Sequence, residues 1–367
     1  MKKQMIISGL TARPVRSIVS ILAVTLEVTL IIVIVGLATG IVSEKAQRTA
    51  GVGADLEVQP AGSSMFFELS GNTMPVSLGD KIAELPGVKA VAPVQTHINT
   101  EDGVETIFGI EPKSFDAVTG GLTWIQGRHF SGIDEIVVDN VWAQSKAATV
   151  GTTVELLNHQ FKIVGIVEQG KLGRVYTSRE TLSSVTGAQV DRVGLFFVKL
   201  NDPGMKKNVK GEIEGLLKGY KVSDVNELAT LMTSANIPGM KPFINSVVFV
   251  ALCIGVLVIF LSMYTTITER TREIGILRSL GASKAFIVGL IFEEAALVSI
   301  LGAVFGIGVS FLLRRVLTSV FPTLIVDITT TWIVIASVSA IASGIIGSFY
   351  PSLKAASQDP VEALAYE

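Results

Sequence analysis

The sequence predicts an α-helical membrane protein with four transmembrane helices and a large α+β extracytoplasmic domain inserted between helices 1 and 2. The mean hydropathy is +0.55, and only 17% of the 367 residues are charged, whereas soluble domains are about a quarter charged. Four apolar runs each reach the roughly 20 residues that a bilayer requires. Residues 42–241 differ, because they alternate turn residues with β-branched runs.

The predicted spans are residues 17–41, 242–267, 285–313 and 332–350. The first run has an alternative interpretation as a signal peptide, because two lysines precede it and the small-residue stretch Ala38–Gly40 lies near its end. A signal-peptide core is about 7–15 residues long. The run exceeds that length and residues 1–16 precede it, so a transmembrane helix is favoured.

Basic residues near the span ends predict the orientation, since cytoplasmic loops carry an excess of Lys and Arg. Most of them precede the first span, lie in the 268–284 segment or follow the fourth span: Lys2, Lys3, Arg13, Arg16, Arg270, Arg272, Arg278, Lys284 and Lys354. Arg314 and Arg315, in the predicted short loop 314–331, conflict with this pattern. The balance predicts that both termini are cytoplasmic and that residues 42–241 lie outside.

Residues 42–241 are predicted to fold as an α+β domain that could divide into two lobes. The clearest strand signal is a hairpin in which 153–157 and 161–167 flank the turn Asn158–Gln160. Helical stretches lie between the strands, and two of them begin with a serine that is a plausible N-cap, Ser77 and Ser178. About 200 residues suffice for a core without disulfides.

No pattern of catalytic or metal-binding residues was found. The P-loop pattern G-x-x-x-x-G-K-[ST] and the zinc motif H-E-x-x-H do not occur in the sequence. The three histidines, His97, His129 and His159, are not at ligand spacing, and the single cysteine, Cys253, is interpreted as a buried thiol. The net charge of −2 argues against a nucleic-acid surface. The prediction is therefore no catalytic residue, no metal and no cofactor.

Polar residues inside the predicted spans need an explanation. A carboxylate at the bilayer centre costs about 2.5–3.5 kcal/mol on insertion scales. Glu27, in the first span, is interpreted either as a proton or substrate contact or, preferably, as a protonated or hydrogen-bonded group facing Thr25, Thr29 or another helix. Glu294 is expected near the interface at the start of the third span. Gly302 and Gly306 form a G-x-x-x-G pair, for which helix packing is predicted.

Residues 268–284 form a polar segment between two apolar spans. On a helix, Ile274, Ile276, Leu277 and Leu280 supply apolar contacts and the neighbouring Glu and Arg residues supply charge. Gly281 is expected to end this helix, and Ser283 to cap the next. From the residues alone, a helix docked on a cytosolic partner and a membrane-surface helix with anchoring arginines are equally favoured.

The stretch "ERTREIGILRSLGAS", residues 269–283, resembles the signature between the second and third transmembrane helices of the MacB/FtsX-like ABC transporter permeases. "GVGADLEVQPAGSS" and the segment 127–170 resemble the start and core of the family's extracytoplasmic domain. The tail "PSLKAASQDPVEALAYE" is similar to the family's C-terminal tail, and Glu294 falls where these permeases usually carry a Glu. The order of spans and domain is also the same, so the resemblance covers nearly the whole chain.

The resemblance implies a permease, without catalytic activity of its own, that couples ATP hydrolysis by a separate ABC ATPase chain to movement of its extracytoplasmic domain. The implied coupling residues are Glu269, Arg270, Arg272, Glu273, Ile274, Gly275, Ile276, Leu277, Arg278 and Gly281. Gly275 is expected to allow close backbone approach. Residues 1–16 would form an amphipathic helix on the inner membrane surface, residues 222–242 a stalk that continues span two, and residues 351–367 a cytoplasmic tail.

The implied setting is the bacterial inner membrane, with a homodimer or heterodimer in the lipid bilayer. A periplasmic membrane-fusion protein and an outer-membrane channel are further partners of such exporters. Export of a drug, peptide or lipid-type substrate is the favoured function. An FtsX-like signalling permease that regulates an envelope hydrolase is the alternative. A membrane-anchored receptor without an ATPase is a third class, which would need no coupling helix.

Overall fold

The computed structural model describes residues 14–63, 72–100, 105–232, 236–237 and 239–358. The chain divides into two compact units. We call the first, Met1–Ile41 with Ile237–Ser319 and Leu324–Glu367, the helical unit, and the second, Val42–Asn236 with Val320–Thr323, the inserted unit. The predicted helix at residues 1–16 lies mostly outside the described residues, as do residues 359–367 of the predicted tail.

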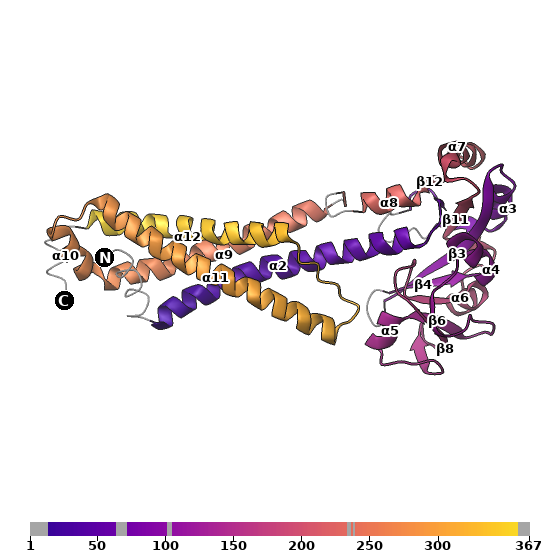
Figure 1. The fold of residues 1–367 in the computed structure, drawn as a ribbon, viewed down its shortest axis with the longest axis horizontal. Helices are drawn as coiled ribbons and strands as arrows, with labels where there is room; N and C mark the ends of the chain where they lie inside the picture. Colours follow the sequence, from indigo (N-terminus) through magenta and orange to yellow (C-terminus); the bar gives the residue numbers. More distant parts are fainter. Residues whose placement is uncertain (1–13, 64–71, 101–104, 233–235, 238, 359–367) are drawn as a thin grey trace. The chain divides into compact units, whose positions relative to one another are not determined.

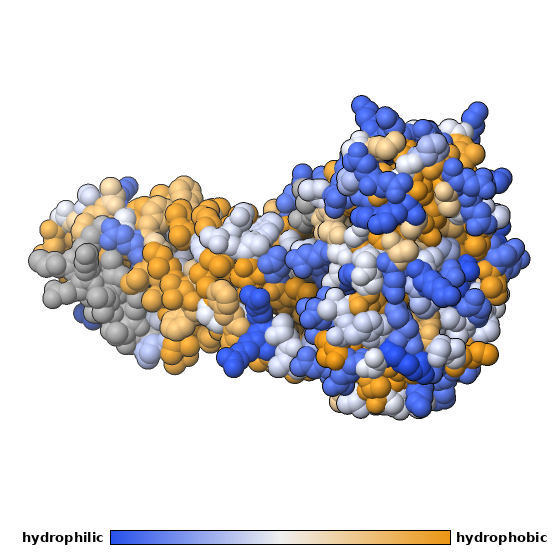
Figure 2. Space-filling model, turned by 45° about the vertical axis from the view of Figure 1, so that its right-hand side comes forward, coloured by the Kyte–Doolittle hydropathy of each residue, from blue (hydrophilic) through white to orange (hydrophobic). Residues whose placement is uncertain are grey.

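The helical unit is built from four helices that are long and apolar enough to cross a membrane. They are α2 (Pro14–Gly51), whose last residues belong to the inserted unit, α9 (Met240–Glu269), α11 (Lys284–Val320) and α12 (Thr330–Ser357). A short helix, α10 (Thr271–Ser279), joins α9 to α11 at one end (Figure 1). The visible face of this unit is mostly hydrophobic (Figure 2), as expected for side chains that contact lipid.

Each of these helices extends beyond the span predicted for it. α12 continues to Ser357 with Pro351 inside the helix, although Pro351 was predicted to begin the tail. Proline lacks the N–H of an ordinary turn and its ring crowds the carbonyl four residues earlier, here that of Gly347. Membrane helices tolerate this because neighbouring groups restore the missing bonds. α9, in contrast, begins directly after Gly239, whose φ is 85°, so the predicted stalk is not one continuous helix.

Gly302 and Gly306 bring α11 close to α2. A Cβ atom at Gly302 would lie 2.5 Å from Cβ of Val24, and one at Gly306 would lie 2.7 Å from Cβ of Val28. At the same two levels, Thr25 and Thr29 of α2 donate hydrogen bonds to the carbonyl oxygens of Gly302 (3.3 Å) and Gly306 (3.2 Å). The absent side chains therefore allow both close packing and interhelical hydrogen bonds.

α12 presents a face of small residues to its neighbours. Gly344 lies against Ser299 of α11, and Gly347 lies against Val256 and Ile259 of α9. The buried small residues of this face recur along the helix: Ala336, Ser339, Ala340, Ser343, Gly344, Gly347, Ser348, Ser352, Ala355 and Ala356. The hydroxyls of Ser348 and Ser352 bond to carbonyls of their own helix, and the hydroxyl of Ser343 donates to Glu27 of α2. Small side chains thus let three helices approach one another without leaving polar groups in lipid.

The inserted unit is built on one mixed sheet in the order β12-β1-β11-β3-β4-β9-β6-β8-β5, with β7 paired to β8 and a separate β10-β2 pair. The strands are β1 (Leu56–Gln59), β2 (Met74–Pro75), β3 (Val88–Asn99), β4 (Glu105–Ile110), β5 (Trp124–Gly127), β6 (Glu135–Asp139), β7 (Thr153–Leu156), β8 (His159–Val167), β9 (Val175–Ser178), β10 (Arg192–Val193), β11 (Leu195–Leu200) and β12 (Lys221–Asp224). The two parallel pairs are β4 with β9 and β6 with β8.

Helices of the inserted unit cover this sheet and connect its strands. They are α3 (Ser77–Ala83), α4 (Pro112–Thr119), α5 (Asn140–Ser145), α6 (Arg179–Thr186), the 3₁₀ turn η1 (Pro203–Met205), α7 (Lys206–Leu216) and α8 (Val225–Leu231). One apolar cluster packs β1, β11 and β12 with α3 and α7, and another packs β6 and β8 with α5 and α6. The two lobes that the sequence allowed therefore share one continuous sheet.

Local predictions in this unit were right in type and inexact in position. The hairpin is confirmed as β7 paired antiparallel with β8, but its turn is Leu157–Asn158, each with φ of 54°. Two residues of positive φ match the twist of the strands, and asparagine adopts this conformation readily, so His159 begins β8 instead of lying in the turn. Ser178 caps α6 by accepting a hydrogen bond from Thr181 N, as predicted.

Ser77 does not cap α3. The residue before this helix is Val76, which already has helical backbone angles and offers no side-chain acceptor. Ser77 is therefore inside the first turn, where its hydroxyl cannot act as an N-cap.

A buried charge network lies within the inserted unit where α2 ends. The guanidinium of Arg48 donates to Asp139 Oδ2 (2.8 Å), Glu44 Oε1 (2.9 Å) and the carbonyl oxygen of Gly173 (2.7 Å). Asp139 also accepts from Trp142 N (2.7 Å) as the N-cap of α5. The last turns of α2 are thus bonded to the end of β6 and to the loop before β9, through charges that are almost fully buried.

We predict that a bulky side chain at Gly306 separates α2 from α11. Gly306→Leu should lower the free energy of unfolding of the helical unit by about 1–3 kcal/mol, because overpacking forces side chains and backbone apart. Gly308→Leu is the matched control, since a Cβ at Gly308 meets nothing within 4 Å. Thermal or denaturant unfolding of the full chain in detergent measures both, and equal effects of the two variants would contradict the packing described above.

Candidate functional site

The candidate site is the α9–α10 joint and α10 itself, within the helical unit. α10 is a helix of nine residues, and the single residue Arg270 separates its start from the end of α9 at Glu269. It ends at Ser279, two residues before Gly281, whose φ is 94°. Ser283 then accepts a hydrogen bond from Phe286 N (3.2 Å) at the start of α11. The stop at Gly281 and the cap at Ser283 are as expected from the sequence.

α10 has an inward and an outward apolar side. Ile274 and Gly275 are buried, and Leu277 packs against the apolar core of the helical unit. Ile276 and Leu280 point outward and are 44% and 80% exposed. The apolar residues Ile274, Ile276 and Leu277 were expected to contact a partner together, but they are divided between the two sides of α10. Neighbouring positions lie about 100° apart on a helix, while positions four apart share a face.

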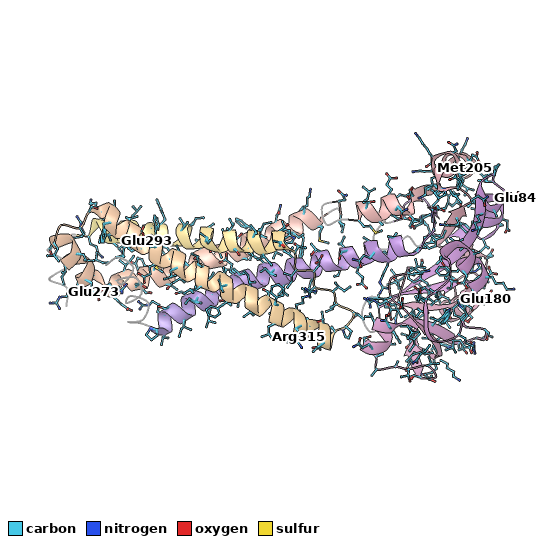
Figure 3. All side chains as sticks on the ribbon, in the orientation of Figure 1. Glu84, Glu180, Met205, Glu273, Glu293 and Arg315 are labelled. Atoms are coloured by element: carbon cyan, nitrogen blue, oxygen red, sulfur yellow. The ribbon has the colours of Figure 1, made fainter. Side chains whose placement is uncertain are left out.

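Exposed charges flank the outward apolar pair. Arg272 and Glu273 are both exposed on the first turn of α10, and Figure 3 labels Glu273 at this end of the helical unit. The outward surface of α10 is therefore an apolar pair with one positive and one negative neighbour. Such a surface suits contact with another folded protein, whose interfaces combine apolar anchors with a polar rim.

The first connection between this segment and a span is made by Arg16. Its guanidinium forms an ion pair with Glu269, the last residue of α9, and a 3.4 Å hydrogen bond with Thr266 Oγ1. Arg16 lies in the first turn of α2. The ends of α2 and α9 are thus held together beside α10.

The second connection is made by Arg270, at the joint. Its guanidinium lies 3.4 Å from Glu294 of α11 and 3.4 Å from Glu273 of α10. Glu294 is 7% exposed, so its negative charge needs a nearby positive partner. These residues line a cavity of about 120 Å³ together with Thr266 and apolar side chains. Glu293, its neighbour in the sequence, is exposed instead.

The third connection is made by Arg278, near the end of α10. It donates hydrogen bonds to the carbonyl oxygens of Ala356 (2.7 Å) and Gln358 (2.8 Å) at the end of α12. The last carbonyls of a helix have no partner within the helix and carry partial negative charge, so an arginine stabilises them. Three arginines therefore connect α10 and its joint to α2, α11 and α12. The sequence named Arg270 and Arg278 as site residues, but no local signal could give their partners.

Glu27 lies apart from this site. It is buried at 1% exposure on the side of α2 that faces α9 and α12. Ser343 of α12 donates a hydrogen bond to Oε2 of Glu27 (3.0 Å), and the same oxygen occupies the notch that Gly255 leaves in α9. Of the partners expected for a hydrogen-bonded Glu27, the structure has the one from another helix, while Thr25 and Thr29 bond α11.

The residues that the structure describes include no group of three His, Cys, Asp or Glu side chains that could hold a metal ion. His129 pairs with Asp116 (3.1 Å) and His159 with Asp134 (2.7 Å), on separate parts of the inserted unit. These are two isolated contacts of partly exposed side chains, whose contribution to stability is small.

Two family models match the chain. Residues 17–216 match the MacB-like periplasmic core domain and residues 245–360 match the C-terminal part of FtsX-like permeases. The chain belongs to the MacB/FtsX-like family of ABC transporter permeases. It is accordingly a membrane protein in which four transmembrane helices flank a periplasmic-type α+β domain, as the sequence predicted.

Individual relatives agree with the family assignment. The macrolide export ATP-binding/permease protein MacB of Neisseria gonorrhoeae is 23% identical over 99% of this permease, and MacB of Aggregatibacter actinomycetemcomitans is 26% identical over the same share. The chain spans about 60% of the length of these MacB proteins. An uncharacterized ABC transporter permease of Bacillus subtilis, YknZ, is 22% identical over 99% of this chain and 98% of its own length.

Two solved structures are similar to part of the permease. The periplasmic region of MacB from Actinobacillus actinomycetemcomitans matches with a TM-score of 0.38 and 18% identity, covering 50% of this chain and 94% of that one. The extracellular domain of YknZ from Gram-positive bacteria matches with a TM-score of 0.37 and 17% identity, covering 47% and 99%.

We predict that Arg278→Ala loosens the end of α12. Loss of two hydrogen bonds from a charged donor removes about 1.5–3 kcal/mol each, so backbone amides in the last turn of α12 should exchange with D₂O at least about tenfold faster. Arg272→Ala is the matched control, because Arg272 is exposed on the same helix. Hydrogen–deuterium exchange of the full chain measures both variants, and unchanged exchange in Arg278→Ala would contradict the connection.

Proposed function

We propose that this chain is the membrane subunit of a MacB-type ABC transporter. It couples ATP hydrolysis by a separate ATPase subunit to a conformational change of its extracytoplasmic domain, in the export of a drug, peptide or lipid-type substrate. The observation that carries the proposal is α10, a short helix with an exposed apolar pair that is connected by arginines to the other spans. A surface helix that only lay on lipid would need no such connections.

The proposed mechanism uses the two sides of α10 differently. Ile276 and Leu280 contact the ATPase, with Arg272 and Glu273 at the rim of the contact. Ile274, Gly275 and Leu277 fix α10 to the core of the helical unit. Displacement of α10 then acts on Glu269, Glu294 and the end of α12 through Arg16, Arg270 and Arg278. In this mechanism the chain itself hydrolyses no ATP and holds no cofactor.

The proposed assembly contains two permease chains, identical or different, and two ATPase subunits. Both chain termini and α10 lie on the cytoplasmic side of the inner membrane, and the inserted unit lies outside. A periplasmic membrane-fusion protein and an outer-membrane channel complete the exporter in this proposal. The relatives support it, since MacB of Neisseria gonorrhoeae is a macrolide export ATP-binding/permease protein.

An FtsX-like signalling permease is the second candidate, because residues 245–360 match that family's C-terminal part. Both candidates need the same coupling helix, so α10 does not separate them. The neighbouring genes do: a membrane-fusion protein favours the exporter, and a peptidoglycan hydrolase favours the regulator.

We predict that Leu280→Asp and Ile276→Asp each weaken ATPase binding. A charge placed in an apolar contact without a partner costs on the order of 1–3 kcal/mol, which is at least about a fivefold loss of affinity. Ile133→Asp is the matched control, because Ile133 is 77% exposed in the inserted unit. Co-purification and ATPase stimulation, with the ATPase supplied as a separate chain, measure the effect. Wild-type binding by both α10 variants would show that α10 is only a membrane-surface helix.

We predict that α10 and the inserted unit lie on opposite sides of the membrane. In a Cys253→Ala background, a membrane-impermeant thiol reagent added to intact cells should label Ser184→Cys and leave Ser279→Cys unlabelled. Both serines are exposed, so each new thiol is accessible once the reagent reaches its side. Permeabilised cells are the control, in which both variants should be labelled. Labelling of Ser279→Cys alone in intact cells would reverse the proposed orientation.

A further inference from the structure

Glu27, Ser343 and Ser299 are buried polar residues within the helical unit, and the proposed coupling does not use them. Its Oε2 accepts the hydrogen bond from Ser343 of α12, while its Oε1 is buried and has no partner among the described residues. Ser299 of α11 has a buried hydroxyl that likewise has no partner there. Two unpaired oxygens buried in an apolar bundle are costly unless something binds them.

The surroundings of Glu27 indicate which ligand it takes. A negative carboxylate at this depth costs several kcal/mol unless it is neutralised. α9 presents Gly255 to it and α12 presents Ser343. The charged side chains of those helices lie near helix ends, at Lys241, Glu269 and Lys354, and the titratable ones between them are Cys253, Tyr264 and Tyr350. No cation therefore faces Glu27 from either helix along the described residues.

The space beside Glu27 excludes a larger ligand. Its Oε2 already fills the notch at Gly255, so that even a methyl group there would overlap the carboxyl. A hydrated metal ion needs several oxygen ligands around it, for which this notch has no room. The proton is the cation that a carboxyl binds without any additional space.

Ser343 and Ser299 are polar groups beside Glu27 on α12 and α11, but no hydrogen bond joins Ser299 to another described residue, so a route from Glu27 to the cavity at the end of the unit needs water as a bridge. Glu294 lines that cavity. Ser299 follows it five residues later on α11, about 7.5 Å along the helix axis at 1.5 Å per residue. The Ser299 hydroxyl packs against Gly344 of α12, and the residue before Gly344 is Ser343, which bonds Glu27.

We propose that Glu27 is a proton-binding site inside the helical unit, which exchanges its proton with the cavity beside Glu294 along Ser299 and Ser343. In the loading step, a hydronium ion in the cavity releases a proton and becomes water. An O–H bond forms at a carboxyl oxygen of Glu27, and the carboxylate charge is cancelled. Unloading is the reverse. The site goes beyond the coupling of ATP hydrolysis, and it does not require the ATPase to be present.

Infrared spectroscopy of the full chain in lipid nanodiscs tests the proposal. The wild type should show a C=O band of a protonated carboxyl that shifts after transfer to D₂O and is absent in Glu27→Gln. Glu27→Asp should move this band without abolishing it, which keeps the assignment testable where one variant fails to fold. Bands from other protonated carboxyls are common to wild type and Glu27→Gln, so the difference spectrum isolates Glu27.

The route is tested by the rate of that shift. Ser299→Ala should slow the exchange of the Glu27 band on the order of tenfold, the effect of one lost hydrogen-bonding group. Ser310→Ala is the matched control, because Ser310 is equally buried on α11 and its hydroxyl bonds to Gly306 O of its own helix (2.7 Å). It should leave the rate unchanged.

Three outcomes overturn the proposal. One is a wild-type spectrum without a carboxyl band that depends on Glu27, which means that Glu27 is ionised. Another is a Glu27 band that does not exchange while the protein stays folded, which means that Glu27 only packs the helices. The third is equal exchange in Ser299→Ala and Ser310→Ala, which removes the route.

Discussion

Hydrocarbon offers no hydrogen-bond partner, and the architecture of the helical unit follows from that constraint. Thr25 and Thr29 satisfy their hydroxyls on glycine carbonyls of α11, and Ser343 donates its hydroxyl proton to one oxygen of Glu27. These bonds require helix axes that lie close together. Glycine and serine on α11 and α12 make the close approach possible, so packing and polar satisfaction depend on the same small residues.

The charged segment between α9 and α11 is also strongly connected to other helices. Arg270 and Arg278 lie at the two ends of α10, and each finds a carboxylate or free carbonyls on another span. Arg16 makes the equivalent contact at the end of α9. Charge-assisted bonds are stronger than neutral ones, and here each joins two different helices. A displacement of α10 must therefore stretch these bonds or move the helices that they hold.

The inserted unit is also held together by contacts between residues far apart in the chain. Its sheet is assembled from strands far apart in the chain, such as β1 with β11 and β4 with β9. The end of α2 joins it through Arg48, whose partners are Asp139 at the end of β6 and Gly173 in the loop before β9. Buried ion pairs tolerate little change, since removal of one partner leaves a charge without compensation. Arg48 therefore fixes which part of the sheet the end of α2 contacts.

The sequence by itself determined the four spans, the inserted α+β domain, the stop at Gly281 and the cap at Ser283, because hydropathy, turn residues and caps act over a few neighbouring positions. It also identified the 269–283 segment and Glu27 as places where charge needed an explanation. Only the tertiary structure decided which side of α10 faces outward, which carbonyls Arg278 holds and which helices enclose Glu27. Those facts depend on contacts between residues up to 316 positions apart, and local pattern carries no information about such pairs.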